Sequence, residues 1–417
     1  MTLKKTPLHE AHALLGAHFT DFGGWDMPLR YSSELEEHRA VREAAGIFDL
    51  SHMGEIWVEG PDAAKYLNST LAGNLAVVAV GRAKYSLLLN EAGGIVDDLI
   101  SYRLGEEKYL VVPNAGNAAE VFNIMQERAA SFDVQLRDAT ADTALIAVQG
   151  PKSAEILAGL MSETDRKVLQ EMKYYSAAYG EVAGQRVLIA RTGYTGEDGF
   201  ELYLERANVN NPGASNSGVN SSGVHNSGVH SSGANSSGAN SSVVTNADTN
   251  SSVVNGSDPN KLWNAILEAG SATGLLPAGL AARDSLRLEA GMPLYGNELG
   301  PGVTPAAANL GPVVSFKKEE QFVGREALET ATETAKVLVG LKGLGRRAGR
   351  SGYAVTVDGK MVGEITSGLP SPTLGYPVAL AYVDREHAEV GTAVDVDLRG
   401  KPQPFEIVSL PFYKREL

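Results

Sequence analysis

The chain has 417 residues, of which 43% are hydrophobic and 21% charged, and its formal net charge is −14. This length and apolar content allow substantial cores, so we expect two or three domains rather than one. The negative charge argues against a general binder of nucleic acid or of anionic membranes. The chain contains no cysteine, which excludes disulfides, thiolate zinc sites, iron–sulfur ligation and a cysteine nucleophile.

The N-terminal sequence MTLKKTP (1–7) has no apolar stretch of the kind found in secretory signal peptides. No uninterrupted span of about 20 apolar residues occurs anywhere in the chain. The sequence therefore predicts a soluble, cytoplasmic protein that does not bind membranes.

The first half of the chain mixes strand and helix patterns. Residues 85–89, 95–104 and 108–112 are predicted to form antiparallel strands, and 117–130 has helical spacing with a polar residue able to cap it.

Two adjacent carboxylates lie inside the predicted strand 95–104. Because successive strand residues point to opposite faces, Asp97 and Asp98 are not expected to form an acid/base dyad. One of them would lie alone in an apolar slot, as a single acid/base or orienting group. The alternative is an ordinary hairpin whose acids are solvated or cap the turn. The expected faces are Asp98 with Val96, Ile100 and Tyr102, and Asp97 with Ile95 and Leu99.

Further along the chain, 187–191 and 200–204 are predicted strands that frame a glycine-containing loop, 193–199. The composition then changes at 208–258 to Asn, Ser, Gly and small apolar residues, with pentads such as SNSGV (215–219). So short a unit cannot bury enough surface to offset its ordering entropy, so we predict a disordered insertion; the alternative is a β-solenoid.

After the insertion, 261–269 has a helical pattern, and the chain from residue 336 alternates short strands with glycine turns. This spacing predicts a small β-barrel. Its expected strands are 337–341, 353–357, 361–366, 378–383, 393–398 and 404–408.

Eight short motifs follow one another along the chain. They are TPL (6–8), FGGW (22–25), FDLSHM (48–53), GGIVDDLI (93–100), QGP (149–151), RTGYTGEDGFEL (191–202), ARDSLRLE (282–289) and ITSG (365–368) with SPTLG (371–375). Each is short, but in this order they are highly specific. Together they resemble the aminomethyltransferases, the T-proteins of the glycine cleavage system, from residue 6 to about residue 413.

The resemblance implies an α+β fold, in which two α+β domains with antiparallel sheets and a C-terminal β-barrel are arranged around a central folate channel. Residues 1–54 and 141–325 would form the folate-binding domain, interrupted by 208–258. Residues 55–140 would form the second domain, which carries Asp98, and 326–417 the barrel.

The resemblance also implies the reaction. The family transfers the methylene of the aminomethyl group on the lipoyl arm of H-protein to tetrahydrofolate, with release of ammonia. The implied co-substrate is tetrahydrofolate, no metal is implied, and the implied partner is lipoylated H-protein, with other cleavage-system components involved only indirectly. Such a transfer needs a pterin held by fixed acceptors, a group that manages the proton at the attacking nitrogen, and a dry cavity.

The family motif places the catalytic acid at Asp98 and a neighbouring amide at Asn114. Ile100 and Tyr102 would line the same surface as Asp98. The motif also places the pterin anchor at Glu201, since a carboxylate can accept two parallel N–H bonds. Without the motif, Glu201 could equally be an outward-facing strand residue.

Tyr194 lies in the glycine-containing loop, where it could present its ring for stacking on the pterin or simply fill the turn. Tyr85 could face the ligand or the core. Both are candidate folate-binding residues.

Arg283 and Arg287 lie four residues apart on a predicted helix and could meet the glutamate carboxylates of folate. Arg287 could instead pair with Asp284 and Glu289. The chain departs from the family here, because Ala281 stands where the family has glycine, which affects local backbone geometry rather than the reaction.

Two other functions fit parts of the pattern. A folate-binding module without transferase activity, as in the iron–sulfur assembly relatives, would carry a cysteine-containing signature where this chain reads MPLYG (292–296). A folate-dependent demethylation partner would carry a flavin domain ahead of the motifs, and we expect none because the motifs begin at residue 6.

Overall fold

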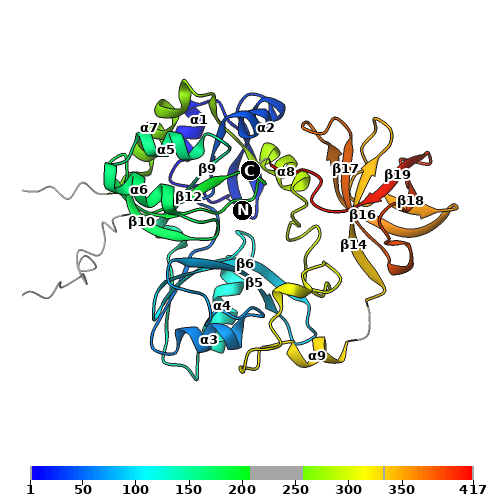
Figure 1. The fold of residues 1–417 in the computed structure, drawn as a ribbon, viewed down its shortest axis with the longest axis horizontal. Helices are drawn as coiled ribbons and strands as arrows, with labels where there is room; N and C mark the ends of the chain where they lie inside the picture. The colour runs from blue at the N-terminus through cyan, green and yellow to red at the C-terminus, as the bar shows by residue number, and fades with distance from the viewer. Residues whose placement is uncertain (1, 207–256, 332–333, 416–417) are drawn as a thin grey trace, which may run out of the picture. The chain divides into compact units, whose positions relative to one another are not determined.

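The computed structural model describes residues 2–206, 257–331 and 334–415 (Figure 1). The predicted insertion, 208–258, lies outside the described residues except for its last two. Of these, Asp258 is the N-cap of helix α7 (Pro259–Ser271), where its Oδ1 accepts a hydrogen bond from the backbone N–H of Asn260 at 2.9 Å. The helical segment therefore begins earlier than the sequence analysis placed it.

The first large sheet has six strands in the order β10–β11–β12–β9–β3–β13. All neighbours are antiparallel except β13, which runs parallel to β3. Helix α5 contacts both α7 and strand β12, and helix α6 contacts strand β10 (Figure 1). The bounds are β3 (Ala45–Asp49), β9 (Thr143–Gln149), β10 (Ala177–Val182), β11 (Gln185–Ala190), β12 (Gly199–Glu205), β13 (Leu275–Pro277), α5 (Ser153–Gly159) and α6 (Glu163–Glu171).

The second sheet has five antiparallel strands in the order β5–β6–β7–β4–β8. Apolar side chains of its strands form a buried cluster with Tyr66 and Leu67 of α3 and Val121 and Met125 of α4. The bounds are β4 (Ile56–Glu59), β5 (Arg82–Leu89), β6 (Ile95–Gly105), β7 (Lys108–Val112), β8 (Gln135–Asp138), α3 (Ala63–Thr70) and α4 (Ala118–Arg128).

An irregularity in β6 corrects the predicted faces of this strand. Leu88 pairs with Asp97 and Leu89 pairs with Ile95, so Val96 is an extra residue in the ladder. Such a bulge reverses the alternation on one side of it. Val96 therefore packs in the same buried cluster as Leu99. Ile95 packs in the same cluster as Leu87, the residue that pairs with Asp98 across the two strands. The predicted places of Ile95 and Val96 were wrong, because a sequence period of two cannot show a bulge.

The predicted barrel is confirmed. Its six strands close in the order β14–β17–β16–β15–β18–β19, and β14 pairs with both β17 and β19 (Figure 1). The bounds are β14 (Lys336–Gly343), β15 (Ala354–Val357), β16 (Lys360–Pro370), β17 (Pro377–Asp384), β18 (Ala393–Asp397) and β19 (Pro402–Val408). The closed barrel and the two mainly antiparallel sheets confirm the expected α+β fold class.

The remaining elements connect these three bodies of structure. Helix α8 (Leu280–Glu289) contacts α2 (Glu34–Glu43) and β2 (Trp25–Arg30), and it also contacts β16 and β17 of the barrel. Strand β1 (His18–Phe22) pairs with β2 through a turn at Gly23 and Gly24, both of which have positive φ. The other helices are α1 (His9–Leu14) and α9 (Arg325–Thr330).

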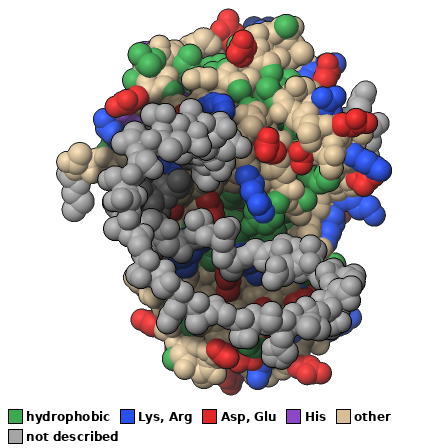
Figure 2. Space-filling model, turned by 90° about the vertical axis from the view of Figure 1, so that its left-hand side faces the viewer, with side chains coloured by type: hydrophobic (Ala, Val, Ile, Leu, Met, Phe, Trp, Pro, Cys, Tyr) green, Lys and Arg blue, Asp and Glu red, His purple; other side chains and the backbone are tan. Residues whose placement is uncertain are grey.

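Acidic and basic side chains are interspersed with hydrophobic ones on the face shown in Figure 2. Within the described ranges, no helix combines the length and apolar character that a membrane span requires.

Candidate active site

A cavity of about 510 Å³ is lined by residues of both large sheets. This volume lies in the range that holds a drug-sized ligand. Strands β5, β6 and β7 contribute from the second sheet and β12 from the first, and helix α8 contributes Arg283. Every predicted site residue except Tyr102 lies in the lining: Tyr85, Asp98, Ile100, Asn114, Tyr194, Glu201 and Arg283.

Asp98 is held by two neutral donors. The hydroxyl of Tyr85 donates to its Oδ2 at 2.9 Å, and Nδ2 of Asn114 donates to its Oδ1 at 2.9 Å. Burial raises the pKa of Asp98, although these hydrogen bonds lower it in part. The geometry gives a single oriented carboxyl whose pKa lies above that of a solvated aspartate.

Asp97 lies on the other face of the strand and does not line the cavity. It is buried, and it accepts hydrogen bonds from the backbone N–H of Asn114 at 3.0 Å and from Nδ2 of Asn117 at 2.8 Å. Burial, together with the neighbouring charge of Asp98, raises the pKa of Asp97 to about 7. Asn114 Nδ2 also donates to Asp97 at 2.9 Å, so one amide links the two carboxyl groups.

Glu201 faces the cavity from β12 with one carboxylate oxygen already engaged. Its Oε2 accepts hydrogen bonds from the hydroxyls of Thr192 at 2.6 Å, Tyr102 at 3.2 Å and Tyr203 at 3.4 Å. No donor among the described residues reaches its Oε1. An N–H group of a ligand could therefore bind this oxygen.

Tyr102 differs from its predicted role. Its side chain is fully buried and absent from the cavity lining, and its hydroxyl contacts Thr192 at 2.9 Å and Glu201. The correct face was predicted, but the residue lies one layer behind the cavity wall because Glu201 and Thr192 stand in front of it. Tyr102 can thus act on a ligand only through the residues in front of it, Glu201 and Thr192.

Tyr194 and Arg283 form one wall of the cavity. The guanidinium of Arg283 lies over the ring of Tyr194, 4.9 Å from its centroid, and the hydroxyl of Tyr194 donates to the carbonyl of Pro293 at 2.5 Å. The stacked pair leaves Arg283 as the cation that lines the cavity from α8.

Arg287, the other arginine on this helix face, does not line the cavity. Its side chain is 1% exposed, with Nε 2.8 Å from Asp284 and Nη1 3.0 Å from Glu298. Of the two alternatives left open for Arg287, the described contacts therefore favour pairing with acids over contact with a folate carboxylate. Its pairing with Asp284 was foreseen, but its second acid is Glu298 rather than Glu289.

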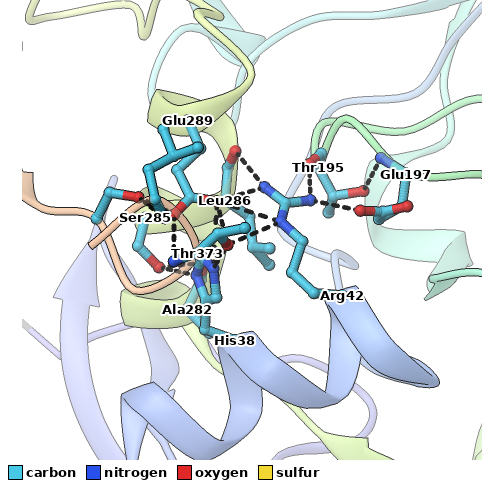
Figure 3. Close-up of polar contacts among 11 residues, drawn as sticks. His38, Arg42, Thr195, Glu197, Ala282, Ser285, Leu286, Glu289 and Thr373 are labelled. Atoms are coloured by element: carbon cyan, nitrogen blue, oxygen red, sulfur yellow. Dashed lines mark hydrogen bonds and ion pairs between the residues drawn. The ribbon is translucent and has the colours of Figure 1, made fainter. Parts of the chain in front are cut away.

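A buried polar network holds α8 and the Thr195 loop in place (Figure 3). Arg42 donates to the carbonyl of Thr195 at 2.7 Å, to Glu197 at 2.9 Å and to Glu289 at 2.8 Å. His38, one turn earlier on α2, contacts Ser285 at 2.7 Å. The sequence analysis missed this network. Its one sequence signal was a His and an Arg four residues apart on α2.

Several lining residues were also missed. Tyr175, Met53 and Tyr295 line the cavity. Met53 lies in the FDLSHM motif (48–53) and Tyr295 in MPLYG (292–296), but no role was predicted for either, and Tyr175 lies outside the motifs. His52 belongs to the FDLSHM motif (48–53), but no role was predicted for it. Its ring lies edge-on to Phe22, with 5.5 Å between the ring centroids, and burial lowers its pKa to about 4, so it is neutral at pH 7.

Comparisons with known proteins agree with this architecture. Residues 8–212 and 253–318 match the GCVT N-terminal domain, and residues 336–414 match the glycine cleavage T-protein C-terminal barrel domain. The chain belongs to the glycine cleavage T-protein family. Its activity is that of an aminomethyltransferase.

Relatives and a solved structure support this assignment over the whole chain. The aminomethyltransferases of Streptomyces coelicolor and Corynebacterium aurimucosum are 51% and 49% identical to it, over 99% of this chain and 98% of each relative. The crystal structure of glycine cleavage system aminomethyltransferase T from Bartonella henselae matches with a TM-score of 0.79 and 35% identity, covering 99% of this chain and 98% of that one. A folate-binding module without transferase activity is not favoured.

Proposed function

We propose that this aminomethyltransferase moves the methylene of the aminomethyl-lipoyl arm of H-protein onto tetrahydrofolate and releases ammonia. The observation that carries the proposal is the placement of Asp98 and Glu201 in one cavity of about 510 Å³. The carboxyl groups of Asp98 and Glu201 are both oriented by neutral donors, and neither forms an ion pair with a described side chain. The T-protein family is folate-binding, which supports tetrahydrofolate as the co-substrate.

The reaction breaks the C–S and C–N bonds of the aminomethyl group and two N–H bonds of the folate. It forms two new C–N bonds, and the two protons from the folate end in a new S–H bond and a new N–H bond, so a methylene-bridged folate, a free thiol and ammonia result. Asp98 orients tetrahydrofolate and accepts the proton from its attacking nitrogen. The burial that raises the pKa of Asp98 makes its carboxylate a stronger base than a solvated aspartate.

Glu201 anchors the pterin. Its open Oε1 accepts one N–H of the ring system, and the second N–H approaches Oε2, which the Thr192 hydroxyl already holds in position. Tyr194, whose ring is fixed by its hydroxyl bond and by Arg283, forms an apolar surface beside the ligand. Arg283 supplies positive charge for a folate carboxylate.

We also propose the domain division 1–54 with 141–325, 55–140, and 326–417. The first six-stranded sheet is built from segments within the first unit, the five-stranded sheet from segments within the second, and the barrel from the third. The cytoplasmic location stays a prediction.

The direct test supplies aminomethylated H-protein and tetrahydrofolate to the full chain and measures ammonia and methylenetetrahydrofolate. We expect the two products in equal amounts. A protein that binds tetrahydrofolate but forms neither product would instead be a folate-binding module.

A further inference from the structure

A second cavity, of about 230 Å³, adjoins the first. Tyr203 is the residue that lines both cavities. In the described part of the chain, its walls include two acids, Glu55 and Glu205, one base, Arg186, and three aromatic rings, those of Trp57, Tyr179 and Tyr203.

Glu55 is the unusual group in this cavity. It lies just before β4, its side chain is 1% exposed, and neither carboxylate oxygen has a hydrogen-bond partner among the described residues. Leaving a buried polar group unpaired is costly, so proteins normally pair such groups with a donor. The cavity beside Glu55 gives space for a donor that is not part of the protein.

The charges around Glu55 favour a cation as that donor. Burial raises the pKa of Glu55 well above its ordinary value, and the neighbouring acid Asp138 raises it further, while no basic side chain lowers it. Among the described residues, Arg186 also lines the cavity, where it lies over the ring of Tyr179 at 5.5 Å. On the adjoining strands, Lys108 pairs with Glu59 at 2.8 Å and Arg137 pairs with Glu205 at 3.4 Å.

The side chains that line the cavity indicate which kind of cation it would bind. Within the described ranges, no group of three or more His, Cys, Asp and Glu side chains could hold a metal ion. Protein cations already lie over two of the rings, Lys108 over Trp57 at 4.4 Å and Arg186 over Tyr179 at 5.5 Å. A buried carboxyl with two unpaired oxygens instead suits a small nitrogen cation, which can donate N–H bonds to the carboxylate and lie against the ring of Tyr203.

We propose that this second cavity is a binding site for ammonium or a short primary alkylammonium ion, with Glu55 as its counter-ion. The proposal rests on the proposed function, which releases ammonia in the first cavity, of which Tyr203 is also a lining residue. Ammonia entering the site takes the proton of the Glu55 carboxyl: the O–H bond breaks, a fourth N–H bond forms, and an ammonium–carboxylate pair results. The site would thus hold the nitrogen product apart from the folate cavity.

The test uses difference infrared spectroscopy of the full chain near pH 7, without folate or H-protein. A protonated buried carboxyl gives a C=O stretching band. We expect the wild type and Glu59→Gln to show one band that Glu55→Gln lacks, beside the band of buried Asp97, whose pKa of about 7 makes it contribute in all three proteins. Glu59 is a matched control because it lies on β4 but is exposed and pairs with Lys108. Adding ammonium chloride should remove the Glu55 band saturably, whereas potassium chloride at the same ionic strength should not.

A second readout is thermal stability, since a ligand that binds only the folded state raises Tm. Ammonium should raise Tm in the wild type and in Glu59→Gln, and its apparent affinity should be at least tenfold weaker in Glu55→Gln. No ammonium-dependent change in the wild type, or an equal response to potassium, would overturn the proposal. Because neither readout uses turnover, a failure here is distinct from a failure of the transfer assay.

Discussion

Glu201 offers the clearest single-residue test of the pterin anchor. Replacing it with glutamine puts an NH₂ group where an acceptor stood, so one ligand N–H would face a donor. We expect tetrahydrofolate to bind more weakly by about 1–3 kcal/mol, measured by calorimetry, with the fold intact. Glu181→Gln, on an exposed position of β10 in the same sheet, should bind normally. Unchanged affinity of Glu201→Gln for tetrahydrofolate would show that Glu201 does not anchor the pterin.

The sequence could predict which residues meet at the site, but not how they are layered. The motif order and strand alternation separated Asp98 from Asp97, and the structure places only Asp98 in the cavity lining. The bulge at Val96 and the position of Tyr102 behind Glu201 depend on tertiary contacts, which no local pattern contains. The ion pair between Arg287 and Glu298 also depends on tertiary contacts.

At the scale of elements, the tie between α2 and the Thr195 loop is expected to matter for catalysis. Arg42 does not line the cavity, but it fixes the loop that carries Tyr194 and the helix that carries Arg283. Arg42→Gln should lower kcat/KM for tetrahydrofolate by roughly 10- to 100-fold, because small displacements of positioning groups are costly. Steady-state kinetics measures this effect.

The matched control for Arg42 is Arg128→Gln. Arg128 also donates to two backbone carbonyls, those of Thr70 and Leu89, both at 2.9 Å, but it lies away from the cavity. If both variants lose stability equally while neither changes kcat/KM, Arg42 has only a structural role. Restoration of kcat/KM in Arg42→Lys would show that its charge is what positions the loop.

The elements themselves were largely predictable. The three strands of the Asp98 hairpin region and all six barrel strands were expected from period-two alternation and glycine turns, and they form. The sequence could not show that α8 contacts α2 and the barrel, because those contacts join residues far apart in the chain.

At the scale of the molecule, Glu289 makes stability depend on pH. Burial alone would raise its pKa, but hydrogen bonds and charge from His38, with further bonds from Ser371 and Arg42, lower it to about 2. Because the pKa of Glu289 is lower in the folded protein than its ordinary value of 4.5, the ionised side chain stabilises the folded state above pH 4.5. This contribution is lost as the pH falls toward 2. The contribution is on the order of 3 kcal/mol.

Thermal unfolding measured from pH 7 to pH 2 tests this linkage. The wild type should lose stability between about pH 4.5 and 2. Glu289→Gln should be less stable at pH 7 and flatter across that range. Parallel curves for the two proteins would show that Glu289 does not carry the pH dependence.

The low-complexity segment is expected to be dispensable. The described chain on either side is anchored to the body, since the N–H of Arg206 donates to Asp142 at 2.7 Å and that of Asp258 to Gln185 at 2.9 Å. Replacing 208–256 with a short Gly-Ser linker, and keeping Asp258 as the helix cap, should leave turnover and Tm nearly unchanged. A large drop in either would contradict the prediction.

The central claim is that Asp98, and not its neighbour, manages the proton at the attacking nitrogen of tetrahydrofolate. The deciding measurement is the turnover of aminomethylated H-protein by Asp98→Asn and Asp97→Asn side by side, with Tm recorded for both. Asp98→Asn should lose roughly 10²- to 10⁴-fold in turnover while folate binding changes less, and Asp97→Asn should mainly lower Tm. Near-normal turnover in Asp98→Asn, or loss of turnover in an Asp97→Asn protein that melts normally, would contradict the account.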